Sequence, residues 1–277
     1  MRYASFLRPD GTASFGSLEG TVIHDLGGAG KPRTLRAALE SEMLDGLEAG
    51  EDHAVSAVTL LPVIPDPGKI LCVGLNYAAH IAEMGHARVG YPAIYTRWAD
   101  TLAAHGEPLL KPRESAAFDY EGELAVIIGK TCRRVPVERA LDHVAGYSIF
   151  HDGSVRDWQR HNIQFTPGKN FPKTGGFGPA LVTPDEVPDL GAQRVQTWLN
   201  GDLVQDQPVS DMIFGVAEII AYCSNFTELR PGDVIATGTP SGVGDKREPP
   251  LFMKAGDRVD ISIGVIGTLS NPIIDEG

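Results

Sequence analysis

Residues 119–129 have the sequence Asp119-Tyr120-Glu121-Gly122-Glu123-Leu124-Ala125-Val126-Ile127-Ile128-Gly129. The apolar run that closes this stretch predicts a β-strand, and side chains two residues apart on a strand point to the same face. Glu121 and Glu123 therefore share one face where the strand begins. They are either glutamates on a solvated strand face or two ligands of a hard cation.

A third carboxylate follows a second apolar run. Residues 144–150 predict another strand, and Asp152 comes soon after it. Mg²⁺ prefers octahedral oxygen coordination and keeps positions open for water or substrate, so three carboxylates suit it. Mn²⁺ and Ca²⁺ accept the same ligands and are alternatives. The sequence thus predicts an open, catalytic metal site at Glu121, Glu123 and Asp152.

The expected strands outnumber the expected helices and do not alternate with them, which favours an α+β fold over a doubly wound sheet. Asn200-Gly201 predicts a two-residue hairpin turn, because both turn positions need positive φ. The strands are expected at 70–73, 93–97, 123–129, 144–150, 178–182, 195–200, 233–237 and 259–263, and the helices near 76–84, 154–160 and 211–224.

Residues 1–64 are expected to form a small N-terminal α/β domain with strands at 2–7 and 21–25. A helix is predicted over 35–47, and Thr34 can cap its start. A linker then separates this domain from a larger one, expected to span 69–277. The residues that mark the linker are Pro62, Pro65, Pro67 and Gly68.

Composition points to small-molecule chemistry. The 277 residues carry a formal charge of -12, which argues against a nucleic-acid surface and requires local cations to bind any anionic substrate. Three cysteines without a C-x-x-C pair favour reduced, buried thiols. No apolar stretch approaches a membrane span and the start lacks a signal-peptide pattern, so a cytoplasmic protein is expected.

Two further motifs carry groups that transfer protons or stabilise charge. His80 and Glu83 lie three apart in a predicted helix and share a face, which is typical of a general base backed by a carboxylate. A solvated helix face is the alternative. Lys169 lies in a segment with proline and glycine that predicts a loop, where it is either a site residue or an ordinary exposed lysine.

Other candidates are expected to bind substrate. Arg156 and Gln159 lie one turn apart and either face a cleft together or lie on a solvated face. Tyr77 and Tyr120 are substrate contacts or half-buried aromatics. The glycine loop, residues 238–244, follows a predicted strand; its backbone N–H groups can approach an anion, but it lacks the ending of a nucleotide P-loop.

Together these motifs resemble the fumarylacetoacetate hydrolase family over about residues 69–272. The chain departs from the family pattern after Phe171, where many relatives continue with Asp-Thr, and at His151, where relatives often carry asparagine. The roles of Lys173 and His151 therefore stay open. The matching segments are Gly74-Leu75-Asn76-Tyr77-Ala78-Ala79-His80-Ile81-Ala82-Glu83, Asp119-Tyr120-Glu121-Gly122-Glu123-Leu124-Ala125-Val126, His151-Asp152-Gly153-Ser154-Val155-Arg156-Asp157-Trp158-Gln159, Gly168-Lys169-Asn170-Phe171 and Gly238-Thr239-Pro240-Ser241-Gly242-Val243-Gly244.

The resemblance implies a mixed β-sheet roll that is commonly a homodimer. It also implies that the three carboxylates are the metal ligands, and that the His80–Glu83 pair closes over the metal and activates water, with Gly85 as a hinge or helix stop. Lys169 would lie beside the metal near a substrate oxyanion, and Thr239 would contact a substrate oxygen.

The expected activity is that of a metal-dependent hydrolase, which cleaves a C–C bond in a β-diketo acid of the acylpyruvate or fumarylpyruvate type. His80 would take a proton from water, and Lys169 would stabilise the oxyanion. An alternative on the same metal site is decarboxylation of an oxaloacetate-like acid or isomerisation of an unsaturated oxo-diacid. An alternative of another class is a non-catalytic, metal-stabilised binding protein.

Overall fold

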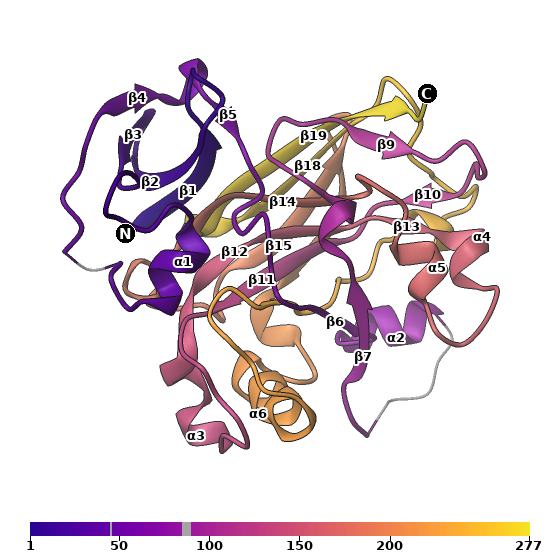
Figure 1. The fold of residues 1–277 in the computed structure, drawn as a ribbon. Helices are drawn as coiled ribbons and strands as arrows, with labels where there is room; N and C mark the ends of the chain where they lie inside the picture. The colour runs from indigo at the N-terminus through magenta and orange to yellow at the C-terminus, as the bar shows by residue number, and fades with distance from the viewer. Residues whose placement is uncertain (45, 85–89) are drawn as a thin grey trace.

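A computed structural model describes residues 1–44, 46–84 and 90–277 (Figure 1). A large mixed sheet runs through the described residues in the order β4-β3-β2-β1-β14-β12-β11-β17-β6-β7, with β5 on β1 and β8 on β14. Its neighbours are antiparallel except for β17 with β6 and β14 with β8. Its strands are β1 (Arg2–Leu7), β2 (Ala13–Glu19), β3 (Val22–Asp25), β4 (Asp52–Ala54), β5 (Thr59–Leu60), β6 (Ile70–Gly74), β7 (Ala93–Arg97), β8 (Leu102–Ala103), β11 (Gly122–Ile128), β12 (Val144–Asp152), β14 (Gly175–Val182) and β17 (Val234–Ala236).

A second sheet packs on the first and closes the main core. Its order is β16-β15-β18-β19-β9. Val126 and Ile149 of the large sheet belong to one buried apolar cluster with Ile261 and Leu269 of the second. Each such side chain contributes about 1.5–3 kcal/mol by leaving water. The strands are β9 (Leu109–Lys111), β15 (Arg194–Leu199), β16 (Asp202–Pro208), β18 (Arg258–Ile263) and β19 (Gly267–Asp275).

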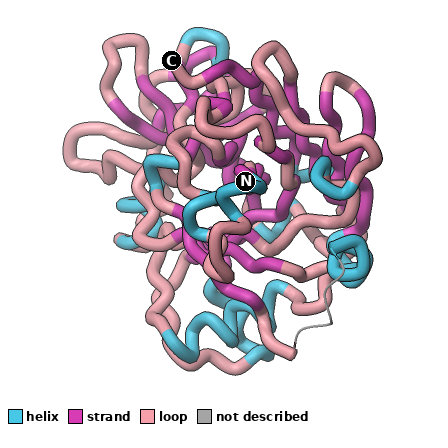
Figure 2. The backbone as a smooth tube through the Cα atoms, turned by 90° about the vertical axis from the view of Figure 1, so that its right-hand side faces the viewer, coloured by secondary structure: helices cyan, strands magenta, loops and turns pink. Residues whose placement is uncertain are grey.

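The helices are short and lie outside the sheets. In Figure 2 the strands form the central body, and helices and loops surround it. Figure 1 shows α2, α4 and α5 close together on one side, next to the paired strands β10 (Phe118–Asp119) and β13 (Ser154–Val155). The helices are α1 (Leu35–Glu40), α2 (Ala78–Met84), α3 (Val137–Ala140), α4 (Arg156–Gln159), α5 (Thr166–Lys169) and α6 (Val216–Phe226).

The strand predictions are confirmed to within a few residues, as is the α+β fold with mixed sheets. The hairpin at Asn200-Gly201 is confirmed as well. It joins β15 to β16, and its two residues have φ values of 54° and 89°. The three cysteines, at 72, 132 and 223, are free and buried, as predicted.

The prediction of a helix over 35–47 is wrong, because α1 ends at Glu40. Thr34 does cap its start by accepting from the Ala37 N–H. At the other end Glu42 adopts a left-handed φ of 54°, and the Met43 N–H donates back to the Ala38 carbonyl at 3.1 Å. This Schellman-type turn reverses the chain and ends the helix.

Three other helices begin later than predicted, and the first of them, α2, expected from near 76, begins at Ala78. Residues 154–155 form β13, so that α4 starts at Arg156. The helix predicted from 211 starts at Val216, because the backbone of Ile213 and the backbone N–H of Phe214 donate to Asn76, at 2.8 and 2.9 Å, and so stay non-helical. Lys169, which was expected in a loop, ends the one-turn helix α5.

The strands of residues 1–64 extend the large sheet, since β1 pairs with β14. The division into domains 1–64 and 69–277 stays a prediction. None of the helices in the described ranges has the length and apolar character needed to span a membrane.

Candidate active site

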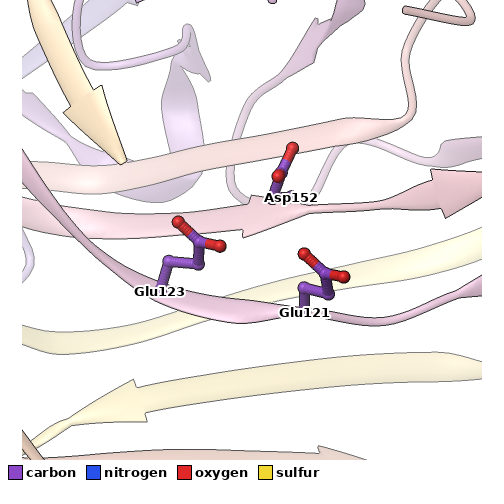
Figure 3. Close-up of side chains that lie close together, drawn as sticks. All are labelled: Glu121, Glu123 and Asp152. Atoms are coloured by element: carbon purple, nitrogen blue, oxygen red, sulfur yellow. The ribbon is translucent and has the colours of Figure 1, made fainter. Parts of the chain in front are cut away.

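Glu121, Glu123 and Asp152 form a buried carboxylate cluster (Figure 3). An oxygen from each lies within 4.8 Å of an oxygen from the others. Glu121 immediately precedes β11 and Glu123 is its second residue, and both point toward Asp152 at the end of β12. The Asp152 N–H donates to the Glu121 carbonyl at 2.9 Å. The prediction that the glutamates share a face is confirmed.

Lys169 lies against this cluster and is buried. Its ammonium donates to Glu121 Oε2 and to Asp152 Oδ2, each at 2.7 Å. The position depends on close packing of α5 against α4, because a Cβ on Gly168 would lie 2.4 Å from the Gln159 nitrogen. Lys169 is therefore beside the cluster, which is where the resemblance places it.

Two residues of β7 that the motif analysis missed hold Asp152. Arg97 Nη1 donates to Asp152 Oδ1 at 2.6 Å, and the Tyr95 hydroxyl donates to Asp152 Oδ2. Tyr95 and Arg97 lie two apart on a strand and so share a face. The alternation within residues 93–97 puts Tyr95 and Arg97 on one face, but nothing local in the sequence directs that face toward Asp152.

Arg156 links the cluster to a fourth buried acid, Asp119. Its Nε donates to Asp119 Oδ2, and its Nη1 lies within ion-pair distance of Glu121 Oε1, each at 2.8 Å. Nη1 also donates to Gln159 Oε1 at 2.9 Å. Arg156 Nη2 is buried and has no hydrogen-bond partner among the described residues. Arg156 also lines the cavity, but this nitrogen is enclosed by protein, so the residue offers the cavity its positive charge through its other atoms.

The charges of this network do not balance. Burial, reinforced by the neighbouring Asp152 and Glu121, raises the pKa of Glu123 well above its usual range. Burial acts the same way on Asp152, but Lys169 and Arg97 outweigh it and hold the pKa of that carboxyl low. Among the described residues four buried carboxylates face three buried cations: Glu121, Glu123, Asp152 and Asp119 against Arg97, Arg156 and Lys169.

This arrangement suits a divalent cation. The three cluster carboxylates offer hard oxygen ligands, and a proton on Glu123 is the alternative way to relieve the excess negative charge. A cation bound there would replace that proton and leave the site net positive. A net positive site favours an anionic ligand.

The His80–Glu83 pair lies on α2. His80 Nδ1 lies 3.1 Å from Glu83 Oε2, and because a carboxylate only accepts, Nδ1 carries the hydrogen. Glu83 Oε1 accepts from the Gly242 N–H at 2.9 Å. Nε2 of His80 is therefore the nitrogen that can exchange a proton with a bound acid. Gly85 lies outside the described residues.

The backbone N–H groups of the glycine loop donate hydrogen bonds to acidic side chains of the protein itself. The N–H groups of Gly238, Gly242 and Gly244 donate to Glu123, Glu83 and Asp119 at 2.8, 2.9 and 2.8 Å. Gly238 has a φ of 106°, and a Cβ there would lie 2.7 Å from the Asn76 Cβ. The anions that this loop was expected to approach are thus side chains that build the site.

A cavity of about 370 Å³ opens onto the cluster. Of the predicted site residues, those that line it are His80, Glu121, Glu123, Arg156, Gln159, Lys169 and Thr239. Glu83 and Asp152 are not in the lining but are bonded to residues that are. The Thr239 hydroxyl donates to the Gly122 carbonyl at 3.0 Å.

Three other candidates lie away from the cavity. Tyr77 is fully buried, is not part of the cavity lining, and its hydroxyl has no partner among the described residues. Tyr120 is also buried and donates to the Gly242 carbonyl at 3.0 Å. Lys173 pairs with Glu107 at 3.0 Å instead of reaching the cluster.

His151 is buried beside the ring of Phe118. It precedes Asp152 on β12, so its side chain points to the opposite face of the sheet. Burial, together with the nearby Arg97, lowers its pKa to about 4. His151 is thus a neutral packing residue at neutral pH.

A family model described as the fumarylacetoacetate (FAA) hydrolase C-terminal domain matches residues 69–274. The chain belongs to the fumarylacetoacetate hydrolase family. It is 43% identical over 225 residues to oxaloacetate tautomerase YisK of Bacillus subtilis, covering 80% of this chain and 75% of that relative. It is 42% identical over 221 residues to the mitochondrial oxaloacetate tautomerase fahd2 of Xenopus laevis, covering 79% of this chain and 69% of the relative.

The fold also matches solved structures of the family. A fumarylacetoacetate hydrolase from Exiguobacterium antarcticum superposes with a TM-score of 0.86 at 36% identity, with both chains fully covered. The predicted family and its fold are therefore confirmed. At a coarse level the protein is an enzyme of this family with a buried carboxylate cluster suited to a divalent cation.

Proposed function

We propose that the protein interconverts the enol and keto forms of oxaloacetate or of a closely similar 2-oxo diacid, with Mg²⁺ at the carboxylate cluster. The observation that carries the proposal is the pair of relatives, about 42% identical over four fifths of the chain, that are named oxaloacetate tautomerases. Tautomerisation is closer to the isomerase, which the sequence offered as an alternative, than to the C–C bond hydrolase, which was the main expectation.

The cavity offers the groups that such a substrate needs. A Mg²⁺ held by the cluster would supply positive charge that favours the enolate form of the bound acid. Arg156 lines the cavity and its guanidinium charge can attract a substrate carboxylate. Gln159 and Thr239 line the same space. The Gln159 amide oxygen accepts from Arg156, which leaves its NH₂ group to donate to a substrate oxygen, whereas the Thr239 hydroxyl is held by the Gly122 carbonyl and the Gln205 amide.

The His80–Glu83 pair would move the proton. Conversion of enol to keto transfers one proton from the enol oxygen to C3 and breaks no carbon–carbon bond. His80 Nε2 can accept a proton and return it, while Glu83 fixes the tautomer and supports the imidazolium. Such a step needs no ordered water.

The test compares two assays on one preparation loaded with Mg²⁺. Decay of the ultraviolet absorbance of enol-oxaloacetate reports tautomerisation, and a coupled dehydrogenase reports pyruvate released from acylpyruvates, fumarylpyruvate and oxaloacetate. We expect enol decay at least about 10²-fold above the buffer rate, abolished by EDTA, with slower release of pyruvate. Pyruvate release from an acylpyruvate that outpaces enol decay would contradict the proposal.

C–C hydrolysis is the second candidate. The observation that favours it is that His80 lines the cavity with Glu83 at its Nδ1, because a histidine backed by a carboxylate also suits activation of water. The two assays separate this reading from tautomerisation. A preparation inactive in both, but still binding Mg²⁺, would support the non-catalytic alternative.

We also infer a homodimer, as the family resemblance implies, and a cytoplasmic location. Exposed large apolar side chains at Tyr91, Trp98 and Ile163 are available for contact between subunits. Light scattering at micromolar concentration checks the first inference. A mass of only 29.7 kDa, that of one chain, would contradict it.

A further inference from the structure

Arg160 and Lys246 line the same cavity but are more exposed to solvent than the buried charge network. The two cations of that network that line the cavity, Arg156 and Lys169, are almost fully buried, at 1% exposure each. The side chains of Arg160 and Lys246 are 57% and 32% exposed. The cavity therefore has an inner cationic end at the carboxylate cluster and an outer one at its mouth.

One carboxylate holds the two outer cations. Arg160 Nη2 pairs with Asp245 Oδ2, and Lys246 Nζ lies 3.8 Å from the same oxygen. The Asp245 side chain is only 7% exposed, and the Asp245 N–H donates to Asp119 Oδ2 at 3.0 Å. The Asp245 backbone is thus held by Asp119, and the Asp245 carboxylate holds Arg160 and Lys246.

The outer end carries one positive charge more than its single acid can neutralise. That excess stands out in a chain whose net charge is -12. The side chain of Asn162 lines the same cavity and offers amide donors. An apolar acyl group makes no favourable contact with these charged side chains, whereas a second carboxylate can accept hydrogen bonds from donors that are already positioned.

We propose that Arg160 and Lys246 form a subsite for the distal carboxylate of the substrate, so that the cavity selects 2-oxo diacids over 2-oxo monoacids. The proposal rests on the proposed function in that both place the 2-oxo acid end of the ligand at the carboxylate cluster. The cavity of about 370 Å³ accommodates diacids longer than oxaloacetate, so chain length is set by the distance between the two ends.

The test uses binding and not turnover. Calorimetry on the Mg²⁺-loaded protein compares 2-oxoglutarate with 2-oxopentanoate, which has the same chain length and lacks the distal carboxylate. Oxalate serves as a ligand for the inner end alone. We expect 2-oxoglutarate to bind about tenfold more tightly than 2-oxopentanoate, since two charge-assisted contacts at a partly exposed site each contribute modestly.

The variants Arg160→Gln and Lys246→Gln should each reduce that ratio about threefold. The double variant should bring it close to one and change oxalate affinity by less than about twofold. Arg194→Gln is the matched control, because Arg194 makes a similar exposed pair with Asp206 and does not line the cavity. Unchanged thermal unfolding of the variants shows that they fold.

A ratio near one in the wild type, or a ratio that survives in the double variant, would overturn the subsite. Binding of oxalate with no binding of 2-oxoglutarate would do so as well. Failure of the enol-oxaloacetate assay with the ratio intact would instead remove the proposed reaction and leave the subsite standing.

Discussion

The carboxylate cluster and the His80–Glu83 pair face one cavity but are built differently. The cluster lies on neighbouring strands β11 and β12 in the middle of the large sheet, and backbone pairing together with buried ion pairs fixes it. His80 and Glu83 come from the short helix α2 outside the sheet, and the Gly242 N–H ties Glu83 to the glycine loop. The sheet thus carries the carboxylate cluster, and a peripheral helix carries the pair that we propose transfers the proton.

This separation explains why one family can support several reactions. A divalent cation site set into a sheet stays the same while groups around the cavity change, so the fold and the metal site do not determine the reaction. The following predictions test whether binding and proton transfer separate in this way.

Loss of a cluster carboxylate should have the largest effect. Glu123→Gln removes a charge and a ligand oxygen, so we expect Mg²⁺ binding to be lost from calorimetric titration, along with enol-oxaloacetate decay. Glu228→Gln is the matched control, since Glu228 forms only an exposed pair with Arg230. Wild-type Mg²⁺ affinity in Glu123→Gln and in Asp152→Asn would refute the metal assignment.

His80→Ala should separate the two functions. The rate of enol decay should fall by about 10²–10⁴-fold, the usual contribution of a positioned acid or base. Affinities for Mg²⁺ and oxalate should stay within about twofold, because neither ligand needs the imidazole. His24→Ala is the control, since His24 pairs with Asp52 on the N-terminal strands. A wild-type rate with the metal bound would assign proton transfer to another group.

Glu83→Gln should have a smaller effect, of about 10²-fold on the rate. The Gly242 N–H needs an acceptor, so the amide oxygen stays with it and the amide NH₂ turns toward His80 Nδ1. The imidazole proton then moves to Nε2, which can no longer act as a base. If the variant unfolds at a lower temperature than the wild type and its rate falls only in proportion to the protein that is unfolded, Glu83 has a structural role instead.

Mg²⁺ affinity should decrease as the pH is lowered, by at most about tenfold per pH unit. Burial, and then the charges of Asp152 and Glu121, raise the pKa of Glu123, so this group holds a proton that the cation must displace. Below that pKa, binding should release about one proton, which titrations in buffers of different ionisation enthalpy would count. Asp152, with its lowered pKa, does not contribute near neutral pH. Affinity independent of pH would contradict this reading.

The sequence predicts the carboxylate cluster well because local strand patterns place all three residues. Glu121 and Glu123 share a face by the period of a strand, and Asp152 follows an apolar run that pairs with theirs. Tyr95 and Arg97 were not predicted as site residues, because Asp152, the carboxylate to which they donate, lies more than fifty residues away in the chain. Such contacts depend on sheet order, which no local pattern reports.

Helix ends were the weakest part of the prediction for a similar reason. The apolar stripe that predicts a helix to residue 47 continues past Glu42, whose positive φ is a turn feature and not a feature of periodicity. The late start of α6 depends on hydrogen bonds to Asn76, a residue far away in the sequence. The partners of the glycine loop were likewise hidden, because its N–H groups donate to acids in two distant segments, Glu83 in one and Asp119 and Glu123 in the other.

Diffraction from crystals grown with Mn²⁺ and oxalate tests the central claim most directly, since anomalous scattering locates the cation. We predict one strong peak among Glu121, Glu123 and Asp152, with oxalate between it and Arg156, in the wild type and in His80→Ala alike. No peak there, with the Lys169 ammonium still bridging Glu121 and Asp152 at saturating Mn²⁺, would contradict the claim that the carboxylate cluster is the cation site.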